Sequence, residues 1–217
     1  MVVLYNTMKL LLHVCCGPCS LEPYRILAQD YDVTLYYSND NIFPEEEFYK
    51  RQAELEKCTN KVIYDKYDHD LWKTQVKNRC VDCYLLRLEK SAKYAKDNGF
   101  THLSTSLAVS PYQQTENIKQ TLTDVCKKYN LVPVFVDFRP FYKDATKRSI
   151  ELGMYRQKYC GCEYSLEERK AQVKKKELNK KAQAQLQEKS KMRKAAIKAK
   201  QDRKRELKAK FKSTSNS

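Results

Sequence analysis

Short runs of β-branched and aromatic residues alternate with helix-forming stretches over the first three quarters of the chain. The runs predict strands at residues 9–14, 33–37, 62–64, 102–105 and 132–138. The stretches between them predict helices at residues 20–30, 45–57, 83–98 and 112–129, with another near 144–152. Strands that alternate with helices build a parallel sheet covered on both faces. We therefore predict an α/β fold with a doubly wound, mostly parallel sheet in a Rossmann-like three-layer arrangement.

The positive charge of the chain is concentrated near its C-terminus. Of 42 Lys and Arg and 27 Asp and Glu in the chain, residues 166–217 contain 19 and 6, a net charge of +13. That leaves 23 against 21, or +2, for residues 1–165. We predict a globular domain at 1–165 and a Lys/Arg-rich C-terminal tail at 166–217, largely helical or disordered. The apolar residues of the tail follow no heptad, and its charge favours polyanions such as nucleic acid.

The N-terminal segment and the hydropathy of the chain bear on its compartment. Residues 1–7 carry no basic residue, and the apolar run at 10–14 is too short for the core of a secretory signal. No stretch approaches the ~20 apolar residues of a membrane span. We expect a cytoplasmic protein without membrane contact, where thiols stay reduced and grouped cysteines favour metal or redox chemistry.

The first predicted strand-to-helix turn reads Cys15-Cys16-Gly17-Pro18-Cys19-Ser20, and the whole chain has only four glycines. Turns that bind a pyrophosphate or a triphosphate need several glycines at this point, so that backbone N–H groups can approach the ligand. We therefore expect no nucleotide cofactor.

Seven of the nine cysteines fall into three clusters, which are Cys15, Cys16 and Cys19, then Cys80 and Cys83, then Cys160 and Cys162. Cys80 and Cys83 at a helix start present two sulfurs on one face, and Cys15 with Cys16 is the nearest second pair by topology. Four thiolates fit either a structural zinc or a 4Fe-4S cluster. We favour iron–sulfur, because zinc ribbons typically pair two Cys-x-x-Cys motifs.

Cys160-Gly161-Cys162 has a different spacing, which lets two thiols close a small and readily reduced disulfide ring. A redox-active dithiol is the interpretation we favour, with a metal-ligand pair or two unpaired thiols as the alternatives. Of the two remaining cysteines, Cys58 follows the end of a predicted helix and Cys126 lies within one, and we interpret both as packing residues.

Polar residues follow several of the predicted strands, and in an open α/β sheet ligands collect beyond the carboxyl ends of strands. These residues are Cys15-Cys16, Asn39-Asp40-Asn41, Ser104-Thr105-Ser106 and Arg139. We expect them to converge with Cys80 and Cys83 on one rim, although ordinary polar loops would look the same. Tyr155, Tyr159 and Tyr164 flank the Cys-x-Cys pair and suit either stacking on RNA bases or a packed aromatic rim.

Two other functions are compatible with parts of this pattern. Cys16-Gly17-Pro18-Cys19 lies between a strand and a helix, like the active-site tetrad of thioredoxins, which suggests a thioredoxin-like disulfide oxidoreductase. A zinc-stabilised RNA-binding module would also explain grouped cysteines and a basic tail. Both alternatives predict a colourless protein, whereas an iron–sulfur protein is brown.

Four motifs occur in an order that resembles one enzyme family. They are His13-Val14-Cys15-Cys16-Gly17-Pro18-Cys19, Cys80-x-x-Cys83-Tyr84, Ser104-Thr105-Ser106-Leu107-x-x-Ser110-Pro111 and Tyr159-Cys160-Gly161-Cys162. Over about residues 8–168 the chain resembles the cobalamin-independent, QueH-like epoxyqueuosine reductases. The basic tail lies outside this resemblance.

The resemblance implies reduction of the epoxide of epoxyqueuosine in tRNA to queuosine, the last step of queuosine biosynthesis. It implies that Cys15, Cys16, Cys80 and Cys83 ligate a 4Fe-4S cluster and that Cys160 and Cys162 form the redox-active pair. The expected partners are the anticodon loop of the tRNA and an external electron donor. Cys19 has no role in this scheme, and its candidate roles are a second metal ion or contact with the epoxide oxygen.

Overall fold

The structure is a computed structural model that describes residues 8–214 of the 217, with side chains described as far as residue 205. Residues 1–7, where we looked for a signal sequence, and residues 215–217 lie outside the described residues. The chain divides into two compact units between Leu166 and Glu167. Among the described helices, none combines the length and the apolar character needed to cross a membrane.

The first unit is built on a sheet of five parallel strands. These are β1 (Lys9–His13), β2 (Asp32–Tyr37), β3 (Val62–Tyr64), β4 (His102–Thr105) and β5 (Val132–Pro133). Their order across the sheet is β3-β2-β1-β4-β5. The chain therefore moves outward from β1 on one side and then restarts on the other side with β4. This reversal between β1 and β4 is the point where open α/β sheets place ligands, and the predicted α/β fold is confirmed.

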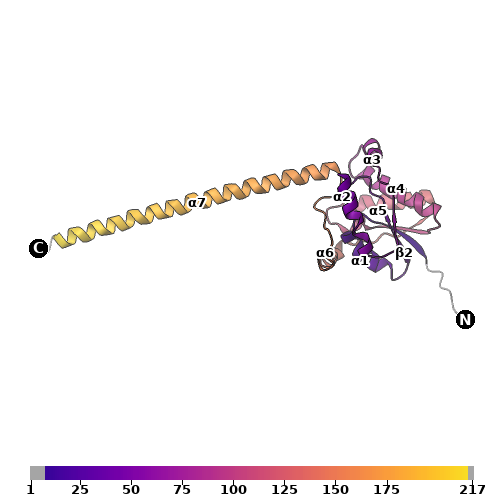
Figure 1. Cartoon of the computed structure of the whole chain (residues 1–217), viewed down its shortest axis with the longest axis horizontal. Coiled ribbons are helices and arrows are strands. Elements are labelled where there is room, and N and C mark those ends of the chain that lie inside the picture. The colour runs from indigo at the N-terminus through magenta and orange to yellow at the C-terminus, as the bar shows by residue number, and fades with distance from the viewer. Residues whose placement is uncertain (1–7, 215–217) are drawn as a thin grey trace. The chain divides into compact units, whose positions relative to one another are not determined.

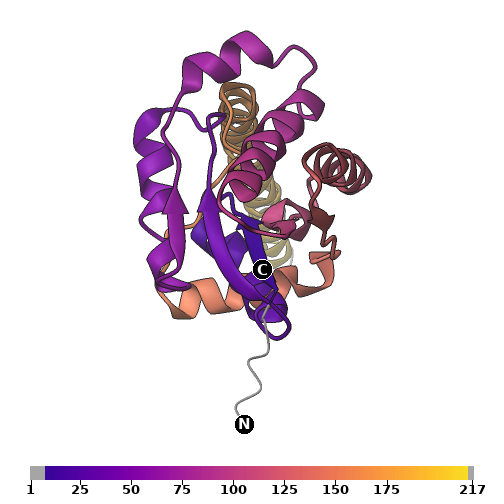
Figure 2. The same ribbon diagram turned by 90° about the vertical axis from the view of Figure 1, so that its right-hand side faces the viewer.

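Helices connect the strands and cover both faces of the sheet (Figures 1 and 2). They are α1 (Gly17–Leu27), α2 (Glu45–Gln52), α3 (His69–Gln75), α4 (Val81–Asp97), α5 (Thr115–Tyr129) and α6 (Tyr142–Glu151). Three short 3₁₀ helices accompany them, η1 (Leu55–Lys57), η2 (Ser106–Val109) and η3 (Arg139–Phe141). The two layers are α1 with α6 and α4 with α5.

The side chains of β1 alternate between the two layers. Leu10 and Leu12 lie in one core, with residues of β2, α1 and α2, whereas Leu11 lies in the other core with α4 and α5. All three leucines are completely buried. A strand with both faces covered reads as a continuous apolar run, which explains why β1 was evident from the sequence.

Some boundaries differ from those predicted. The last strand was predicted at 132–138 but ends at Pro133, and the N–H of Val134 makes the last hydrogen bond to β4, to the carbonyl of Leu103 at 2.8 Å. The apolar residues after it are packing residues of the core rather than strand residues. The helix α1 begins three residues earlier than predicted, so that Cys19 lies within its first turn.

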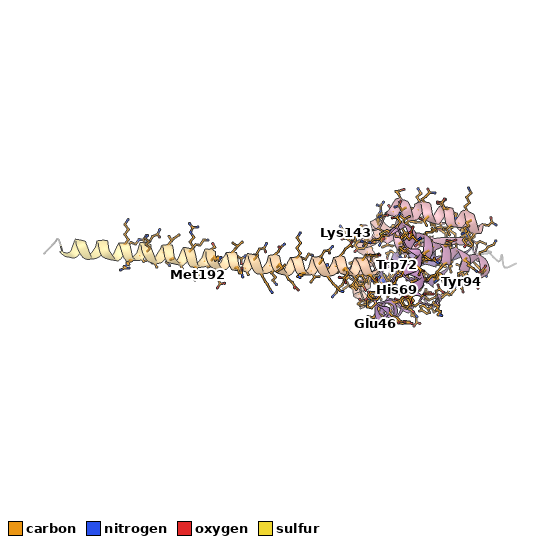
Figure 3. The ribbon with its side chains drawn as sticks, turned by 90° about the horizontal axis from the view of Figure 1, so that it is seen from above. Glu46, His69, Trp72, Tyr94, Lys143 and Met192 are labelled. Atoms are coloured by element: carbon orange, nitrogen blue, oxygen red, sulfur yellow. The ribbon has the colours of Figure 1, made fainter. Side chains whose placement is uncertain are left out.

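The sequence did not predict α3, in which His69 is the first residue. The ring of His69 stacks on that of Trp72 with 5.3 Å between centroids (Figure 3). His69 is buried and its Nδ1 lies 2.7 Å from the carbonyl oxygen of Asp40. This short helix therefore packs against the loop that follows β2.

The C-terminal segment is one long helix, α7 (Glu163–Thr214) (Figure 1). Its first residues belong to the first unit, and the rest of the helix forms the second. Of the two states predicted for the tail, helical or disordered, the structure has the helical one. The Ala, Lys, Gln and Glu residues that dominate this segment have high helix propensity.

Candidate active site

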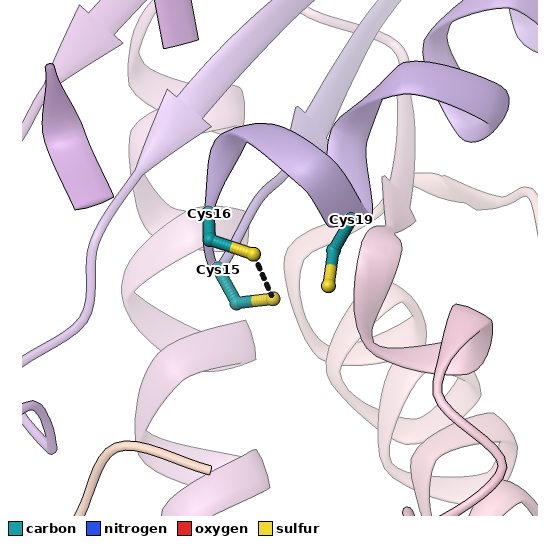
Figure 4. Close-up of side chains that lie close together, drawn as sticks. All are labelled: Cys15, Cys16 and Cys19. Carbon is teal, nitrogen blue, oxygen red and sulfur yellow. Dashed lines mark hydrogen bonds between the residues drawn. The ribbon is translucent and has the colours of Figure 1, made fainter. Parts of the chain in front are cut away.

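Three thiols meet where β1 passes into α1. Cys15 and Cys16 join the strand to the helix, and Cys19 is in the first turn of α1. Their sulfur atoms lie within 4.8 Å of one another, and the Sγ atoms of Cys15 and Cys16 are 3.8 Å apart (Figure 4). Cys19, for which the sequence left two candidate roles open, is therefore part of this thiol group.

The turn before α1 requires the residues found in it. A Cβ atom on Gly17 would lie 2.6 Å from Cβ of Glu54, so only glycine lets α1 approach the chain segment between α2 and η1 this closely. Pro18 is in the first turn, where its missing N–H has no partner to lose. Both residues place the thiols at the N-terminus of α1, where the helix dipole and free N–H groups favour thiolates.

The three thiols differ in acidity. Interactions with the thiols of Cys16 and Cys19 lower the pKa of Cys15 well below its usual range, even though burial raises it. Burial raises the pKa of Cys16, and the interaction with Cys15 raises the pKa of Cys19. Cys15 is therefore the thiol of this group that ionises first.

The second cysteine pair lies at the start of α4, where the backbone is strained. Cys80 has φ of 68° and ψ of −57°, and the N–H of Val81 donates to the carbonyl of Arg79 at 3.0 Å, which makes Cys80 the centre of a γ-turn. This conformation costs about 1–3 kcal/mol for a residue with a side chain. Asp82 accepts two hydrogen bonds from backbone N–H groups of the preceding loop. The structure therefore fixes a cysteine in a conformation that cysteines rarely adopt.

Contacts of α4 bring this pair close to the first group. Cys15 and Cys80 pack against the same small apolar cluster, which contains Tyr84. Arg87, one turn after Cys83 on the same face of α4, is 3% exposed. Burial lowers the pKa of Arg87, but nearby thiols raise it by more, chiefly those of Cys83, Cys15 and Cys160. One buried guanidinium thus interacts with all three cysteine clusters.

The loop after β2 orients this guanidinium. Nη2 of Arg87 donates to Oδ1 of Asn39 at 2.5 Å, and Nδ2 of Asn39 donates to the carbonyl of Val14 at 2.9 Å. Burial raises the pKa of the Cys83 thiol to about 11, against the lowering effect of Arg87. Asn39 therefore lies at the rim where the sequence predicted it, and it is linked to the thiols indirectly, by orienting the side chain of Arg87.

The loop that carries the third cluster is attached to α2 by Arg51. Arg51 is 1% exposed, and its Nε donates to the carboxylate of Glu47 at 2.9 Å. Its Nη1 and Nη2 donate to the carbonyl oxygens of Cys160 and Tyr159 at 2.8 and 3.2 Å. A buried ion pair thus fixes the backbone just before Gly161.

Gly161 itself is required by its conformation and its surroundings. It has φ of 143°, and a Cβ atom there would lie 2.9 Å from Nδ2 of Asn41. Its carbonyl accepts a hydrogen bond from the N–H of Phe43 at 2.9 Å, and its N–H donates to Oγ of Ser165 at 3.1 Å. The Cys-x-Cys loop therefore has one defined conformation.

The two thiols of this loop have different surroundings. Cys160 is exposed, and its Sγ accepts a hydrogen bond from Nε2 of Gln113 at 3.3 Å. Cys162 is 7% exposed and packs with Trp72 and Cys83. Both are thiols, not joined in a disulfide. One thiol thus faces solvent while the other contacts a cysteine of the second cluster.

A glutamine from the same segment reaches the first cluster. Nε2 of Gln157 donates to the Sγ atoms of Cys16 and Cys19 at 2.8 and 3.5 Å. At the end of β4, the hydroxyl of Ser106 accepts a hydrogen bond from the N–H of Cys15 at 3.3 Å. Residues from four separate segments therefore surround the turn before α1.

Other polar residues predicted at the rim have structural partners. Asp40 is buried and paired with Lys90 at 2.8 Å. Thr105 lies 2.9 Å from the ring of His13. Arg139 is exposed and forms an ion pair with Asp137 at 2.6 Å, so its partner is a carboxylate rather than a thiol.

The tyrosines beside the Cys-x-Cys pair divide into packed and exposed ones. The hydroxyl groups of Tyr155 and Tyr159 donate to the Glu47 carboxylate and to the Phe43 carbonyl at 2.6 and 2.5 Å. These two belong to a packed rim, which was one of the two predicted alternatives.

Two exposed aromatic rings flank the same loop. Tyr164 is 52% exposed, and the guanidinium of Arg79 lies 5.4 Å from its ring centroid. Tyr112, which the sequence did not single out, is 86% exposed and precedes the glutamine that contacts Cys160. Exposed rings beside an exposed thiol suit contact with unpaired bases.

Several side chains around the thiols have unused hydrogen-bonding capacity. Among the described residues, the buried atoms without a partner include Nε1 of Trp72, Nε of Arg87, Oδ1 of Asn41 and Oγ of Ser104. Trp72 and Arg87 both lie close enough to Cys83 to lower its pKa, yet these two nitrogens have no acceptor at normal geometry. Buried donors without acceptors are costly, and a bound anionic group such as the sulfides of an iron–sulfur cluster would supply acceptors.

The sequence contained one unused indication of these partners. Cys80, Cys83 and Arg87 follow at intervals of three and four residues, so they share a face of α4. A charged residue on the face of a helix that carries two cysteines is a candidate partner for them. Arg51, Gln113 and Gln157 have no comparable pattern.

Comparison with known proteins identifies one family. Residues 10–168 match the family model described as "Epoxyqueuosine reductase QueH". The matched region contains all three cysteine clusters, and residues 169–217 lie outside it.

Curated proteins with the same name are similar over most of the chain. The protein from Streptococcus pyogenes serotype M1 is 31% identical over 180 residues, which cover 72% of this chain and 70% of that protein. The one from Histophilus somni is 35% identical over 176 residues, covering 73% and 72%. The one from Staphylococcus epidermidis is 31% identical over 205 residues, covering 83% and 84%.

Proposed function

This chain belongs to the epoxyqueuosine reductase QueH family, and we propose that it reduces the epoxide of epoxyqueuosine in tRNA to give queuosine. As a member of this family it is an oxidoreductase. The observation that carries the proposal is the convergence of three cysteine clusters at the end of β1, around the buried Arg87. A packing role for these cysteines would require neither the strained backbone at Cys80 nor buried cations beside thiols.

Cys15, Cys16, Cys80 and Cys83 are the residues that we propose as ligands of a 4Fe-4S cluster. Each thiolate of such a cluster binds a different iron, so its ligands are more widely spaced than those of a single ion. Two pairs at the starts of two helices supply four thiolates, and the Sγ atoms of Cys15 and Cys16, which are 3.8 Å apart, must turn away from each other for each to bind its own iron. When bound, the cluster supplies single electrons at low potential.

Cys19 then remains beside the cluster site as an additional thiol. Its sulfur belongs to the group of three within 4.8 Å, which is a spacing that a single metal ion can bridge. We propose that Cys19 binds a second metal ion or contacts the epoxide oxygen. The hydrogen bond from Gln157 would orient it in either role.

The buried Arg51 and Arg87 compensate the negative charge of this site. A group with four thiolate ligands is anionic, and burial of an unpaired anion is strongly unfavourable. Arg87, 3% exposed and hydrogen-bonded to the neutral Asn39, provides compensating charge, whereas the charge of Arg51, 1% exposed, is shared with Glu47. Neutral residues at these two positions would leave the thiolates without a counter-ion.

Cys160 and Cys162 are the pair that we propose to reduce the substrate. Epoxide and dithiol give alkene, disulfide and water, because two thiols release two electrons and two protons as the S–S bond forms and the two C–O bonds break. Cys160 is exposed and can reach a substrate, whereas Cys162 is buried next to Cys83. An external electron donor must then restore the two thiols.

The substrate nucleoside has to reach this pair from an RNA loop. Unpaired anticodon bases can be splayed apart and stacked on aromatic rings. Tyr112, next to the glutamine that contacts Cys160, and Tyr164, two residues after Cys162, are exposed and provide such rings. We expect them to contact the bases next to the modified one.

Turnover on tRNA tests this function directly. Protein purified without oxygen is mixed with tRNA that carries epoxyqueuosine and with a chemical reductant, and the nucleosides are analysed by mass spectrometry. We expect the epoxyqueuosine signal to be replaced by one that has lost an oxygen atom. Cys162→Ser should abolish the conversion, while Cys126→Ser, in a buried site of α5, should retain it. Full conversion by Cys162→Ser would exclude the dithiol step, and no conversion by the unaltered protein would exclude the function.

A further inference from the structure

The second unit, residues 167–214 of α7, presents charge rather than an apolar surface. Among the described side chains of this unit, residues 167–205, all are exposed except that of Arg169, which is half-buried. Figure 3 shows these side chains extending from the helix along its length, with Met192 among them. A helix that buries nothing contributes no core, so its sequence is free to serve binding.

All side chains from residue 170 to residue 205 are exposed to solvent. The residues 166–217 carry a net charge of +13, counted from the sequence. An exposed helix with this charge attracts polyanions, and its charge pattern decides which kind it can bind.

Six of the cations form a stripe along the helix, with one gap of 11 residues, about 16 Å, between Lys180 and Lys191. They follow one another at intervals of 4, 11, 3, 4 and 7 residues, and they are Lys176, Lys180, Lys191, Lys194, Lys198 and Arg205. Each interval is close to a whole number of turns at 3.6 residues per turn, so the six occupy about a sixth of the helix circumference. At 1.5 Å per residue the stripe is about 44 Å long.

Three acidic residues lie beside this stripe rather than within it. Glu177, Glu188 and Asp202 follow at intervals of 11 and 14 residues and form a row of their own, each three residues before a cation of the stripe. Within the described side chains, none of the six cations of the stripe has an ion-pair partner. Like charges at intervals of three and four residues destabilise an isolated helix, and bound anions would remove that repulsion.

The apolar residues of α7 argue against a membrane surface as the partner. Val173, Leu178, Leu186, Met192 and Ile197 follow at intervals of 5, 8, 6 and 5 residues. These intervals do not gather the side chains on one face, whereas a helix that lies in a membrane interface needs a continuous apolar face. A straight row of cations without an apolar face instead matches the regular phosphates of a nucleic-acid backbone.

We propose that the cationic stripe of α7 binds the phosphate backbone of tRNA outside the anticodon loop. The identity of the RNA rests on the proposed function, whereas the binding of a phosphate backbone rests on the stripe alone. The stripe contributes affinity without sequence preference, since phosphate contacts do not read bases. It thereby raises the fraction of the enzyme that holds a substrate without entering the chemistry.

A pair of matched variants of the full-length protein tests this proposal. In the first, the six cations of the stripe are replaced by glutamine. In the second, glutamine replaces six cations that are spread over more than a third of the circumference, Lys174, Lys175, Lys181, Lys189, Arg203 and Lys204. Both variants lose the same charge, and glutamine keeps the helix propensity. The probe is a labelled tRNA transcript, and its binding is followed by fluorescence anisotropy over a range of salt concentrations.

We expect the first variant to lose about 4–5 units from the slope of log K against log salt, at 0.7–0.9 per phosphate contact, and the second to lose less than half of that. Equal losses of slope in the two variants would overturn the proposal, as would an unchanged slope in the first variant. Binding to phosphatidylserine vesicles that depends on the stripe, without an effect on tRNA, would also overturn it. Both variants should convert saturating tRNA at the normal rate. If the proposed function itself is wrong, the unaltered protein will not convert tRNA, whatever the salt dependence of its tRNA binding.

Discussion

Replacement of Gly161 by alanine should displace the redox pair while leaving the rest of the fold intact. The φ of 143° at Gly161 is a region that residues with a side chain rarely adopt, and this costs about 1–3 kcal/mol. The new Cβ would also lie 2.9 Å from Nδ2 of Asn41, 3.1 Å from Cγ1 of Ile42 and 3.3 Å from Nη1 of Arg51. Such crowding adds about 1–3 kcal/mol unless the loop moves.

Gly99→Ala provides the matched control for this change. Gly99 has φ of 72°, but a Cβ there would meet nothing within 4 Å. It therefore carries the backbone cost alone, about 1–2 kcal/mol, which corresponds to a fall of roughly 2–8 °C in Tm for a protein of this size. We expect this variant to keep full turnover on tRNA.

The assay compares Tm, epoxide reduction and the rate at which Cys160 and Cys162 form a disulfide with a mild oxidant. For Gly161→Ala we expect at least a tenfold loss of reduction and a slower disulfide, because the hydrogen bonds of Arg51 to the Cys160 carbonyl and of Phe43 to the Gly161 carbonyl cannot both persist. If Gly161→Ala matches Gly99→Ala in both reduction and disulfide formation, the conformation of this loop has no functional importance.

Two further changes test the site. Arg87→Met should lower the iron retained per chain after desalting and cost about 3 kcal/mol in stability. Lys93→Met, which removes an exposed cation of the same helix whose partner Asp97 is also exposed, should do neither, and equal iron in the two variants would refute the counter-ion role. Tyr112→Ala should raise the KM for tRNA about 5- to 150-fold with kcat unchanged, since stacking of one base contributes about 1–3 kcal/mol, and an effect no larger than that of Tyr49→Ala on α2 would exclude stacking.

The fold followed from patterns within short segments. The strands β3 and β4 begin and end where the sequence predicted, although β3 is an edge strand that is only half-buried and β4 has one apolar residue, Leu103. The end of β5 was wrong, because the apolar residues that follow it serve core packing. The helix α3 was missed, because its seven residues have no apolar periodicity and depend on the capping carboxylate of Asp68.

The candidate site was predictable only where its residues are close in the sequence. Grouped cysteines at the ends of predicted elements were evident, because thiols at such spacings are unusual in a core. The side chains that position them were not evident, since their partners are distant. Arg51, for example, binds the carbonyl of a residue 109 positions away, and Gln157 reaches a thiol 141 positions away. Such contacts depend on the tertiary structure and leave no local pattern.

In the proposed site, one cysteine pair in the turn before α1 and one at the start of α4 hold a single iron–sulfur cluster. The most direct measurement is the iron and acid-labile sulfide content of protein purified without oxygen, together with its Mössbauer spectrum. We predict about four iron and four sulfide per chain, with loss of both in Cys15→Ser and in Cys80→Ser but not in Cys58→Ser. Protein that contains neither iron nor sulfide after reconstitution, or that contains stoichiometric zinc instead, would contradict the account.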